Sequence, residues 1–245
     1  MIIALEPKRP PRGEPMKSGD DTPQNRLTSR YALVIFDLDG TLVTLDKSVW
    51  QLLHDSLGTD PAERQATLKK ARSGEITYDE WFHTDLIMLR KAGACRDDVR
   101  RVLGDLHVID GAHELLLALR QAGARIAIIS GGVKMTLELA LPNETFDEVF
   151  INEIHYDTDG RISGGLSTPY DGAGKADGLQ VLAERWNLDT SEIAFIGDGS
   201  NDVEIARLAG MSVAWGDSPT ALQEASDHII AGPDLRTLIP LLLED

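Results

Sequence analysis

The segment 31–41 reads YALVIFDLDGT, an unbroken apolar run that ends in two carboxylates two residues apart. A short continuous apolar run is typical of a strand covered on both faces, as in a parallel sheet. Gly40 permits a sharp turn directly after the run. Because open α/β sheets build their sites at the carboxyl ends of parallel strands, Asp37 and Asp39 are predicted to lie at such a site.

Further apolar runs resemble the first strand and recur along the chain. They cover residues 125–129, 147–151, 192–196, 211–215 and 228–231. The last run is short and is expected at an edge of the sheet. Helical patterns separate the runs, at residues 112–121, 175–187, 201–208 and 219–225. Strands that alternate with helices predict an α/β fold with a doubly wound parallel sheet.

One long segment, 47–107, breaks this alternation because its patterns are all helical. The patterns cover residues 48–57, 61–71, 78–91 and 96–103. We therefore expect a small all-helical cap at 47–107, inserted after the first strand of a core formed by 30–46 and 108–245. Residues 1–29 contain five prolines among polar and charged residues, which predicts a disordered tail. The sequence Asp-Thr-Asp-Gly at 157–160 predicts a hairpin turn.

The composition narrows the class of partner. Acidic residues outnumber basic ones 40 to 24, for a net charge of −16, which argues against binding to nucleic acid or to anionic membrane surfaces. No apolar run approaches the roughly 20 residues that a membrane span needs. The single cysteine, Cys95, fits a reducing compartment and a cytoplasmic location. A small phosphorylated metabolite stays compatible, because a local lysine and a metal ion can offset a distant negative field.

Three more features carry side chains suited to a phosphate site. Ser130 and Gly131 follow the second strand, where a hydroxyl and free amides can hold phosphate oxygens. Lys175 opens a helix, although the helix dipole favours acids at that end. Asp198 and Asp202 flank a turn after another strand, and their oxygens suit Mg²⁺. Each feature alone also fits an ordinary capped turn, whereas together they predict a cradle for a dianion and its metal.

In this order, the four motifs resemble the haloacid dehalogenase superfamily over about residues 31–245. The helical insert makes the chain similar to the phosphoserine phosphatases of that superfamily. The resemblance implies a Rossmann-like core and Mg²⁺-dependent hydrolysis of a small phosphomonoester. Asp37 would form an aspartyl phosphate, while Asp39 would give a proton to the leaving group and take one from water.

The resemblance also implies a role for each remaining residue of the motifs. Mg²⁺ would bind Asp37, Asp198 and the backbone carbonyl of Asp39, and Asp202 would support the metal shell or Lys175. The phosphate and substrate would be held by a set of residues comprising Thr41, Ser130, the Gly131 amide, Lys175, Asn201 and Asp46.

Two positions depart from the phosphoserine phosphatase pattern. Asp46 stands where a glutamate usually holds the substrate amine. Asp85 stands where an arginine usually holds the substrate carboxylate, and an aspartate facing the substrate there would repel that group. Arg72 and Arg90 are candidate substitutes. A sugar or polyol phosphate as substrate, a phosphotransferase, and a non-catalytic module that binds a phosphometabolite therefore stay open, and no oligomeric state is predicted.

Overall fold

A seven-stranded sheet organises the structure, a computed structural model that describes residues 27–45, 47–172 and 174–244. The strand order is β5-β4-β3-β2-β6-β7-β8. Neighbouring strands are parallel except for β5, which pairs antiparallel with β4. The bounds are β2 (Leu33–Phe36), β3 (Arg125–Val133), β4 (Glu148–Tyr156), β5 (Ile162–Leu166), β6 (Ile193–Gly197), β7 (Met211–Trp215) and β8 (His228–Ile230). The predicted parallel strands and the edge position of β8 are confirmed, and the predicted hairpin turn joins β4 to β5.

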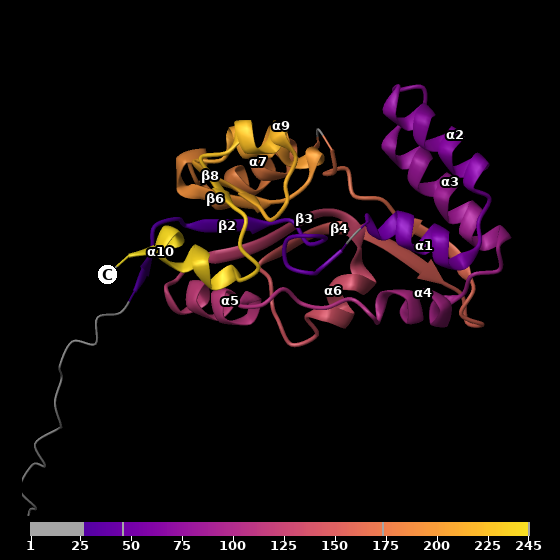
Figure 1. The fold of residues 1–245 in the computed structure, drawn as a ribbon, viewed down its shortest axis with the longest axis horizontal. Helices are drawn as coiled ribbons and strands as arrows, with labels where there is room; N and C mark the ends of the chain where they lie inside the picture. The colour runs from indigo at the N-terminus through magenta and orange to yellow at the C-terminus, as the bar shows by residue number, and fades with distance from the viewer. Residues whose placement is uncertain (1–26, 46, 173, 245) are drawn as a thin grey trace, which may run out of the picture.

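Helices cover both faces of the sheet, as a doubly wound fold requires (Figure 1). One face carries α5 (Ala112–Gln121), α6 (Lys134–Ala140) and α10 (Ile239–Leu242). The opposite face carries α7 (Gly174–Trp186), α8 (Val203–Leu208) and α9 (Thr220–Ala225). Short 3₁₀ turns lie at η1 (Thr190–Glu192), η2 (Ser200–Asp202) and η3 (Leu235–Leu238).

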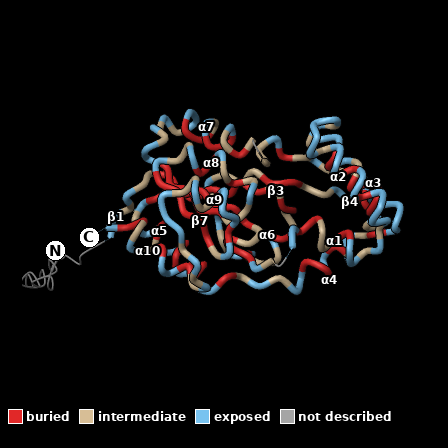
Figure 2. Tube along the Cα trace, turned by 45° about the horizontal axis from the view of Figure 1, so that its top comes forward, coloured by how far each residue is buried: buried red, intermediate tan, exposed pale blue. Residues whose placement is uncertain are grey.

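The first strand of this sheet, β2, lies in the middle and is buried on both faces. Val34 and Phe36 pack into the apolar cluster on the α5 side, whereas Leu33 and Ile35 pack into the cluster on the α7 side. All four side chains are fully buried, and the central strands appear buried in Figure 2. Each such side chain contributes about 1.5–3 kcal/mol by leaving water. This double burial explains why the run is continuously apolar rather than alternating.

Four helices lie between β2 and α5 in the chain, and we call residues 47–107 the cap. They are α1 (Val49–Leu57), α2 (Pro61–Arg72), α3 (Tyr78–Lys91) and α4 (Arg96–Leu103). Their apolar residues form a separate cluster that includes Trp50, Phe82 and Leu89. Helices α2 and α3 project from the core as a pair, and much of the surface of α2 is exposed (Figures 1 and 2).

The two segments that connect the cap to the core lie side by side. The Thr44 N–H donates to the His107 carbonyl oxygen at 2.8 Å, and the Ile109 N–H donates to the Leu42 carbonyl oxygen at 2.9 Å. Val43 and Val108 form an antiparallel bridge between these bonds. The chain therefore enters and leaves the cap at one place.

Two features at the periphery differ from the sequence prediction. The short strands β1 (Thr28–Ser29) and β9 (Leu243–Glu244) pair antiparallel, so residues 28–29 belong to the fold although the tail was predicted to extend to residue 29. The rest of the predicted tail, residues 1–26, lies outside the described part. Helix α6 was also not predicted. Among the described residues, no helix has the length and apolarity that a membrane crossing requires.

Candidate active site

The predicted motifs meet at the carboxyl ends of three adjacent strands. Asp37 follows β2, Asp198 follows β6, and Ser130 lies near the end of β3. Because β2 lies between β3 and β6 in the sheet, these ends are neighbours. A cleft of about 620 Å³ lies there, between the core and the cap. Its lining includes the predicted residues Asp37, Asp39, Ser130, Gly131, Asp198 and Asn201.

Lys175 lies beneath this cleft and is fully buried. Its Nζ lies 3.1 Å from Asp37 Oδ2 and 2.6 Å from Asp202 Oδ1. Burial by itself would lower the pKa of Lys175, but the carboxylates of Asp202 and Asp37 raise it. A buried ammonium without such partners would be strongly destabilising. Lys175 is therefore a fixed positive charge directly beside the Asp37 carboxylate.

Three carboxylates gather in a geometry that suits a divalent cation. One oxygen each from Asp37, Asp198 and Asp202 lies within 4.8 Å of the others. An octahedral Mg²⁺ with oxygens at about 2.1 Å has its ligands about 3–4 Å apart, so this set fits the ion after a small adjustment. The Thr41 hydroxyl donates to Asp198 Oδ1 at 3.0 Å and fixes that carboxylate. The Asp39 side chain is outside this group.

Burial changes the acidity of these carboxyl groups. Burial, and then the nearby carboxylate of Asp198, raise the pKa of Asp39 to about 7. Burial and then Asp202 raise the pKa of Asp198 to about 6. Burial also raises the pKa of Asp37, and Lys175 opposes this change. Asp39 can therefore hold or release a proton near neutral pH, as an acid-base group requires.

The turn after β2 can approach Asp198 only because residue 40 is a glycine. Gly40 has φ +87°, a conformation that other residues rarely adopt. A Cβ atom at this position would lie 2.1 Å from Asp198 Oδ2. The absence of a side chain at Gly40 thus brings the ends of β2 and β6 together.

The family of the chain follows from comparison with known proteins. The family model for haloacid dehalogenase-like hydrolases matches residues 34–207, which is most of the chain. The chain belongs to this family.

Relatives of this haloacid dehalogenase-like hydrolase include several phosphoserine phosphatases. The chain is 29% identical to phosphoserine phosphatase SerB2 of Mycobacterium tuberculosis over 86% of its own length and 50% of that protein. It is 28% identical to the phosphoserine phosphatase of Idiomarina loihiensis, over 86% of its length and 93% of the relative. The chain thus spans about half the length of the mycobacterial relative and nearly all of the Idiomarina protein.

Solved structures confirm the fold. A phosphoserine phosphatase solved as a phospho-aspartyl intermediate analogue superposes with a TM-score of 0.67 at 22% identity, over 86% of this chain and 99% of that one. A haloacid dehalogenase family hydrolase from Salmonella enterica serovar Typhi gives a TM-score of 0.71 at 24% identity, over 90% of this chain and 73% of that one.

The cap side of the cleft is basic and aromatic. Among the described cap residues that line it, the charged ones are Lys47, Arg64 and Arg72. Trp50 and Trp81 line it as well. This side of the cleft therefore offers positive charge and aromatic surface.

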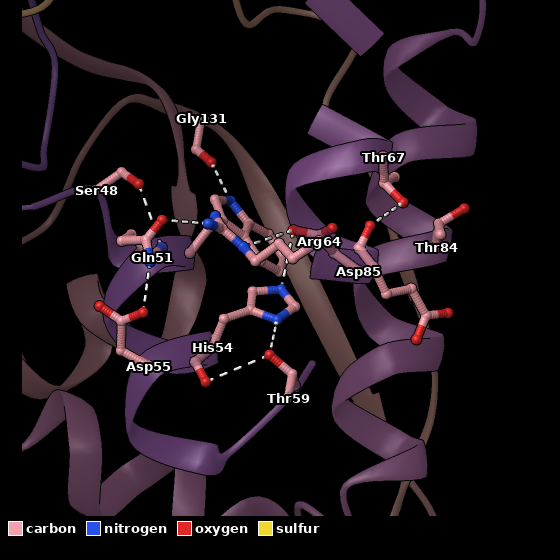
Figure 3. Close-up of polar contacts among 12 residues, drawn as sticks. Ser48, Gln51, His54, Asp55, Thr59, Arg64, Thr67, Thr84, Asp85 and Gly131 are labelled. Carbon is pink, nitrogen blue, oxygen red and sulfur yellow. Dashed lines mark hydrogen bonds and ion pairs between the residues drawn. The ribbon is translucent and has the colours of Figure 1, made fainter. Parts of the chain in front are cut away.

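The expectation that Asp85 faces the substrate is wrong. Asp85 is fully buried inside the cap and is not among the described residues that line the cleft. Its Oδ2 lies 3.0 Å from His54 Nε2 and 4.0 Å from Arg64 Nε (Figure 3). Arg64 also donates from Nη1 to Gln51 Oε1. Asp85 therefore holds an arginine from inside the cap and cannot repel a ligand in the cleft directly.

Of the two suggested substitute arginines, Arg72 lines the cleft and Arg90 is not among its described lining residues. Arg64 was not predicted. No local pattern separates Arg64 from the other basic residues of α2, which are Lys69, Lys70 and Arg72.

Another residue of the cleft was missed, and one prediction falls outside the description. Asp171 lines the cleft and accepts a hydrogen bond from Asn201 Nδ2 at 2.9 Å. It lies in the loop before α7, where no local pattern marks it. The position of Asp46, predicted to contact the substrate, lies outside the described residues.

Proposed function

We propose that this chain is a Mg²⁺-dependent phosphatase that hydrolyses a small phosphomonoester through a covalent phosphate on Asp37. One observation carries the proposal: the Asp37 carboxylate lies 3.1 Å from a fully buried lysine and within 4.8 Å of the ligand oxygens of Asp198 and Asp202. An acid is a useful nucleophile toward a phosphate dianion only if nearby positive charge offsets their repulsion. Membership of a hydrolase family and the phosphoserine phosphatases among the relatives support it.

In the first step, a carboxylate oxygen of Asp37 bonds to phosphorus while the bond from phosphorus to the ester oxygen breaks. Asp39 gives its proton to that leaving oxygen, so an alcohol departs. The pKa of about 7 fits this role because much of Asp39 is still protonated at neutral pH. The Ser130 hydroxyl, the Gly131 amide and the Lys175 ammonium hold the phosphoryl oxygens during the transfer.

In the second step, water attacks the phosphorus of the aspartyl phosphate and regenerates the Asp37 carboxylate. Asp39, now ionised, takes the proton from the water, and inorganic phosphate is released. Asp37, Asp198, the backbone carbonyl of Asp39 and, directly or through water, Asp202 would hold Mg²⁺. When bound, the ion supplies positive charge that neutralises the phosphoryl oxygens.

The basic cap side of the cleft favours a leaving group that carries an anion. Arg64 donates from Nη1 to Gln51, its Nε forms an ion pair with Asp85 at 4.0 Å, and its Nη2 has no hydrogen bond to the described residues. A guanidinium is always charged, and this nitrogen can donate to a carboxylate oxygen of the substrate. Phosphoserine is therefore the preferred substrate. A neutral sugar or polyol phosphate remains the second candidate, because the aromatic surface of Trp50 and Trp81 suits a sugar ring.

A binding module without catalysis is the alternative from another class. It is disfavoured because the nucleophile, the acid-base carboxyl and the lysine all lie around one cleft or directly beneath it. A phosphotransferase would use the same first step and would differ only in the acceptor. The cytoplasmic location stays a prediction from the sequence.

The decisive experiment compares Asp37→Asn with the wild-type protein. We expect phosphate release to fall by at least ~10³-fold, because an amide cannot form the covalent intermediate. Asp177→Asn, an exposed change on α7, is the matched control and should retain activity. Removal of Mg²⁺ with EDTA should stop the reaction and Mg²⁺ should restore it. Phosphate release by Asp37→Asn at the wild-type rate would refute the mechanism.

A further inference from the structure

Ser130, Gly131 and Gly132 form an irregular stretch near the end of β3, where the pairing with β4 shifts register, and we call this stretch the loop. Side chains of the cap and of β4 hold it. Trp50 Nε1, from α1, donates to the Gly131 carbonyl oxygen at 2.9 Å. Asn152 Nδ2, from β4, lies 2.8 Å from the same oxygen and 3.1 Å from the Gly132 carbonyl oxygen. The carbonyl groups of Gly131 and Gly132 therefore have assigned donors.

Asn152 itself has only one possible orientation. It is fully buried, and its Oδ1 accepts a hydrogen bond from the Thr168 N–H at 2.9 Å. Its Nδ2 lies 2.7 Å from the hydroxyl oxygen of Tyr78, at the start of α3, in addition to the two loop carbonyls. A flipped amide would place its oxygen among acceptors and its nitrogen against a donor. Asn152 thus links the loop to the cap through Tyr78.

The orientation of the Gly131 carbonyl determines where the next N–H points. In a trans peptide the C=O and the following N–H point in opposite directions. Because Trp50 and Asn152 hold the Gly131 carbonyl, the Gly132 N–H is turned to the other side, where it donates to Ser130 Oγ at 3.1 Å. A hydroxyl that accepts a hydrogen bond still has its own proton to donate. The Ser130 hydroxyl is thereby left to donate into the cleft that it lines.

Two carboxylates leave the loop little room to move. A Cβ atom on Gly131 would lie 2.2 Å from Asp171 Oδ2, and one on Gly132 would lie 2.6 Å from Asp39 Oδ2. Burial first, and then the Asp171 carboxylate beside it, raise the pKa of Tyr78, so its hydroxyl stays protonated. The cap residue Tyr78 therefore contacts Asn152 and has the carboxylate that borders the loop in its surroundings.

We propose that Asn152 and Trp50 are positioning residues that orient the phosphate-binding loop, and that Tyr78 makes this orientation depend on the position of the cap. The inference rests on the proposed function, because it takes the loop to hold the phosphoryl group. When the cap lies over the core, the loop carbonyls are fixed and the Ser130 hydroxyl is aligned. When the cap moves away, Gly131 loses Trp50 and Asn152 loses Tyr78. Closure over a substrate thus completes the phosphate site as well as excluding water.

The test measures binding of inorganic phosphate by calorimetry and turnover of three esters: phosphoserine, phosphoethanolamine and p-nitrophenyl phosphate. Tyr78→Phe removes one hydroxyl, and Trp50→Phe removes one N–H while retaining an aromatic ring. Each should weaken phosphate binding by about threefold to tenfold, the usual effect of one hydrogen bond. Each should lower kcat/KM by a similar factor for all three esters, because the loop faces the phosphate that they share.

Tyr156→Phe is the matched control, since the Tyr156 hydroxyl is buried without a hydrogen-bond partner in the described structure. It should leave phosphate binding unchanged. The double variant Trp50→Phe with Tyr78→Phe should lose less than the product of the single losses, because both residues fix the same loop. Asn152→Ala should lose more than either single variant, and thermal unfolding of each variant shows whether it is folded.

The outcomes separate this inference from the proposed function. Phosphate binding within twofold of wild type in both folded ring variants would overturn the inference, whatever the activity. A loss confined to one ester would also overturn it, because that would place these residues at the leaving group. If the wild-type protein binds phosphate but hydrolyses no ester, the proposed function fails, whereas weaker phosphate binding by the variants would still support the positioning role.

Discussion

The protonation state of Asp39 should make the rate of the reaction depend on pH. Its raised pKa, about 7, means that the protonated form persists toward neutral pH and is lost as the pH rises further. Because the leaving alkoxide of phosphoserine needs that proton, kcat/KM should fall as the pH rises through about 7. p-Nitrophenolate leaves without help, so p-nitrophenyl phosphate should show a much weaker fall. Profiles between pH 5 and 9 test this, and equal falls for both esters would exclude Asp39 as the acid.

Arg64 and Arg72 both line the cleft. Their variants show which of the two binds the leaving group. Arg64→Gln should raise the KM for phosphoserine by about 10-fold to 100-fold, the effect of a lost hydrogen bond to a charged group. The KM for phosphoethanolamine, which lacks only the carboxylate, should change by less than about threefold. Arg72→Gln is the control with little effect on either. If Arg64→Gln affects both esters equally, the guanidinium does not bind the carboxylate.

The misassignment of Asp85 shows what spacing alone leaves undetermined. The phosphoserine phosphatase pattern put Asp85 at the position of a substrate-binding arginine, but the direction of a side chain on a helix follows the buried face. Trp81, Phe82 and Leu89 are buried on α3, and Asp85 lies in the row of Trp81 and Leu89 at intervals of four residues. The helical period therefore predicts an inward aspartate. What it could not supply was the partner, because Arg64 is on a different helix.

At the scale of elements, apolar runs located the strands because each run is buried on both sides. The β2 residues are all fully buried, so their pattern has no ambiguity. Helix α6 was missed because it has seven residues and no side-chain cap. Asn152 was missed for another reason: it lies in β4 among residues of mixed character, and its partners Tyr78 and Gly131 are far away in sequence. Long-range hydrogen bonds leave no local pattern.

A single methyl group tests whether the close approach of the turn after β2 to Asp198 is needed for Mg²⁺ binding. Gly40→Ala places a Cβ against the Asp198 carboxylate and imposes a side chain at φ +87°. Displacement of a ligand by such strain should raise the Mg²⁺ concentration for half-maximal activity by about 10-fold to 100-fold. Gly164→Ala, in β5, is the control because a Cβ there meets no atom within 4 Å. An unchanged Mg²⁺ dependence in Gly40→Ala would show that the turn can adjust.

For the whole molecule, the cluster of buried carboxyl groups makes the stability of the folded protein depend on Mg²⁺ and on pH. The raised pKa values of Asp39 and Asp198 mean that the folded protein binds protons more tightly than the unfolded chain. The metal-free protein should therefore lose stability as the pH rises from about 4 through about 7. Because Mg²⁺ competes with those protons, the increase in the Tm of the protein on adding Mg²⁺ should be larger at pH 8 than at pH 5.5.

This dependence can be measured by thermal unfolding with and without Mg²⁺. Sodium chloride at equal ionic strength is the control, because the net charge of −16 also responds to screening. Asp198→Asn should abolish most of the Mg²⁺-specific gain, since it replaces a charged carboxylate ligand of the cluster with a neutral amide. The same gain in this variant would place the ion elsewhere.

The paired connections at Thr44 and His107 have a consequence for how substrate range can change. The two segments that connect the cap to the core are hydrogen-bonded side by side. The whole cap could therefore be replaced as one module while the residues of the core site are retained. A chimera that splices a foreign helical insert at these two residues would inherit the chemistry of its host and the selectivity of its donor. The foreign insert would also have to replace the hydrogen bond from Trp50 to the Gly131 carbonyl oxygen, which the core residue Asn152 would otherwise bind alone.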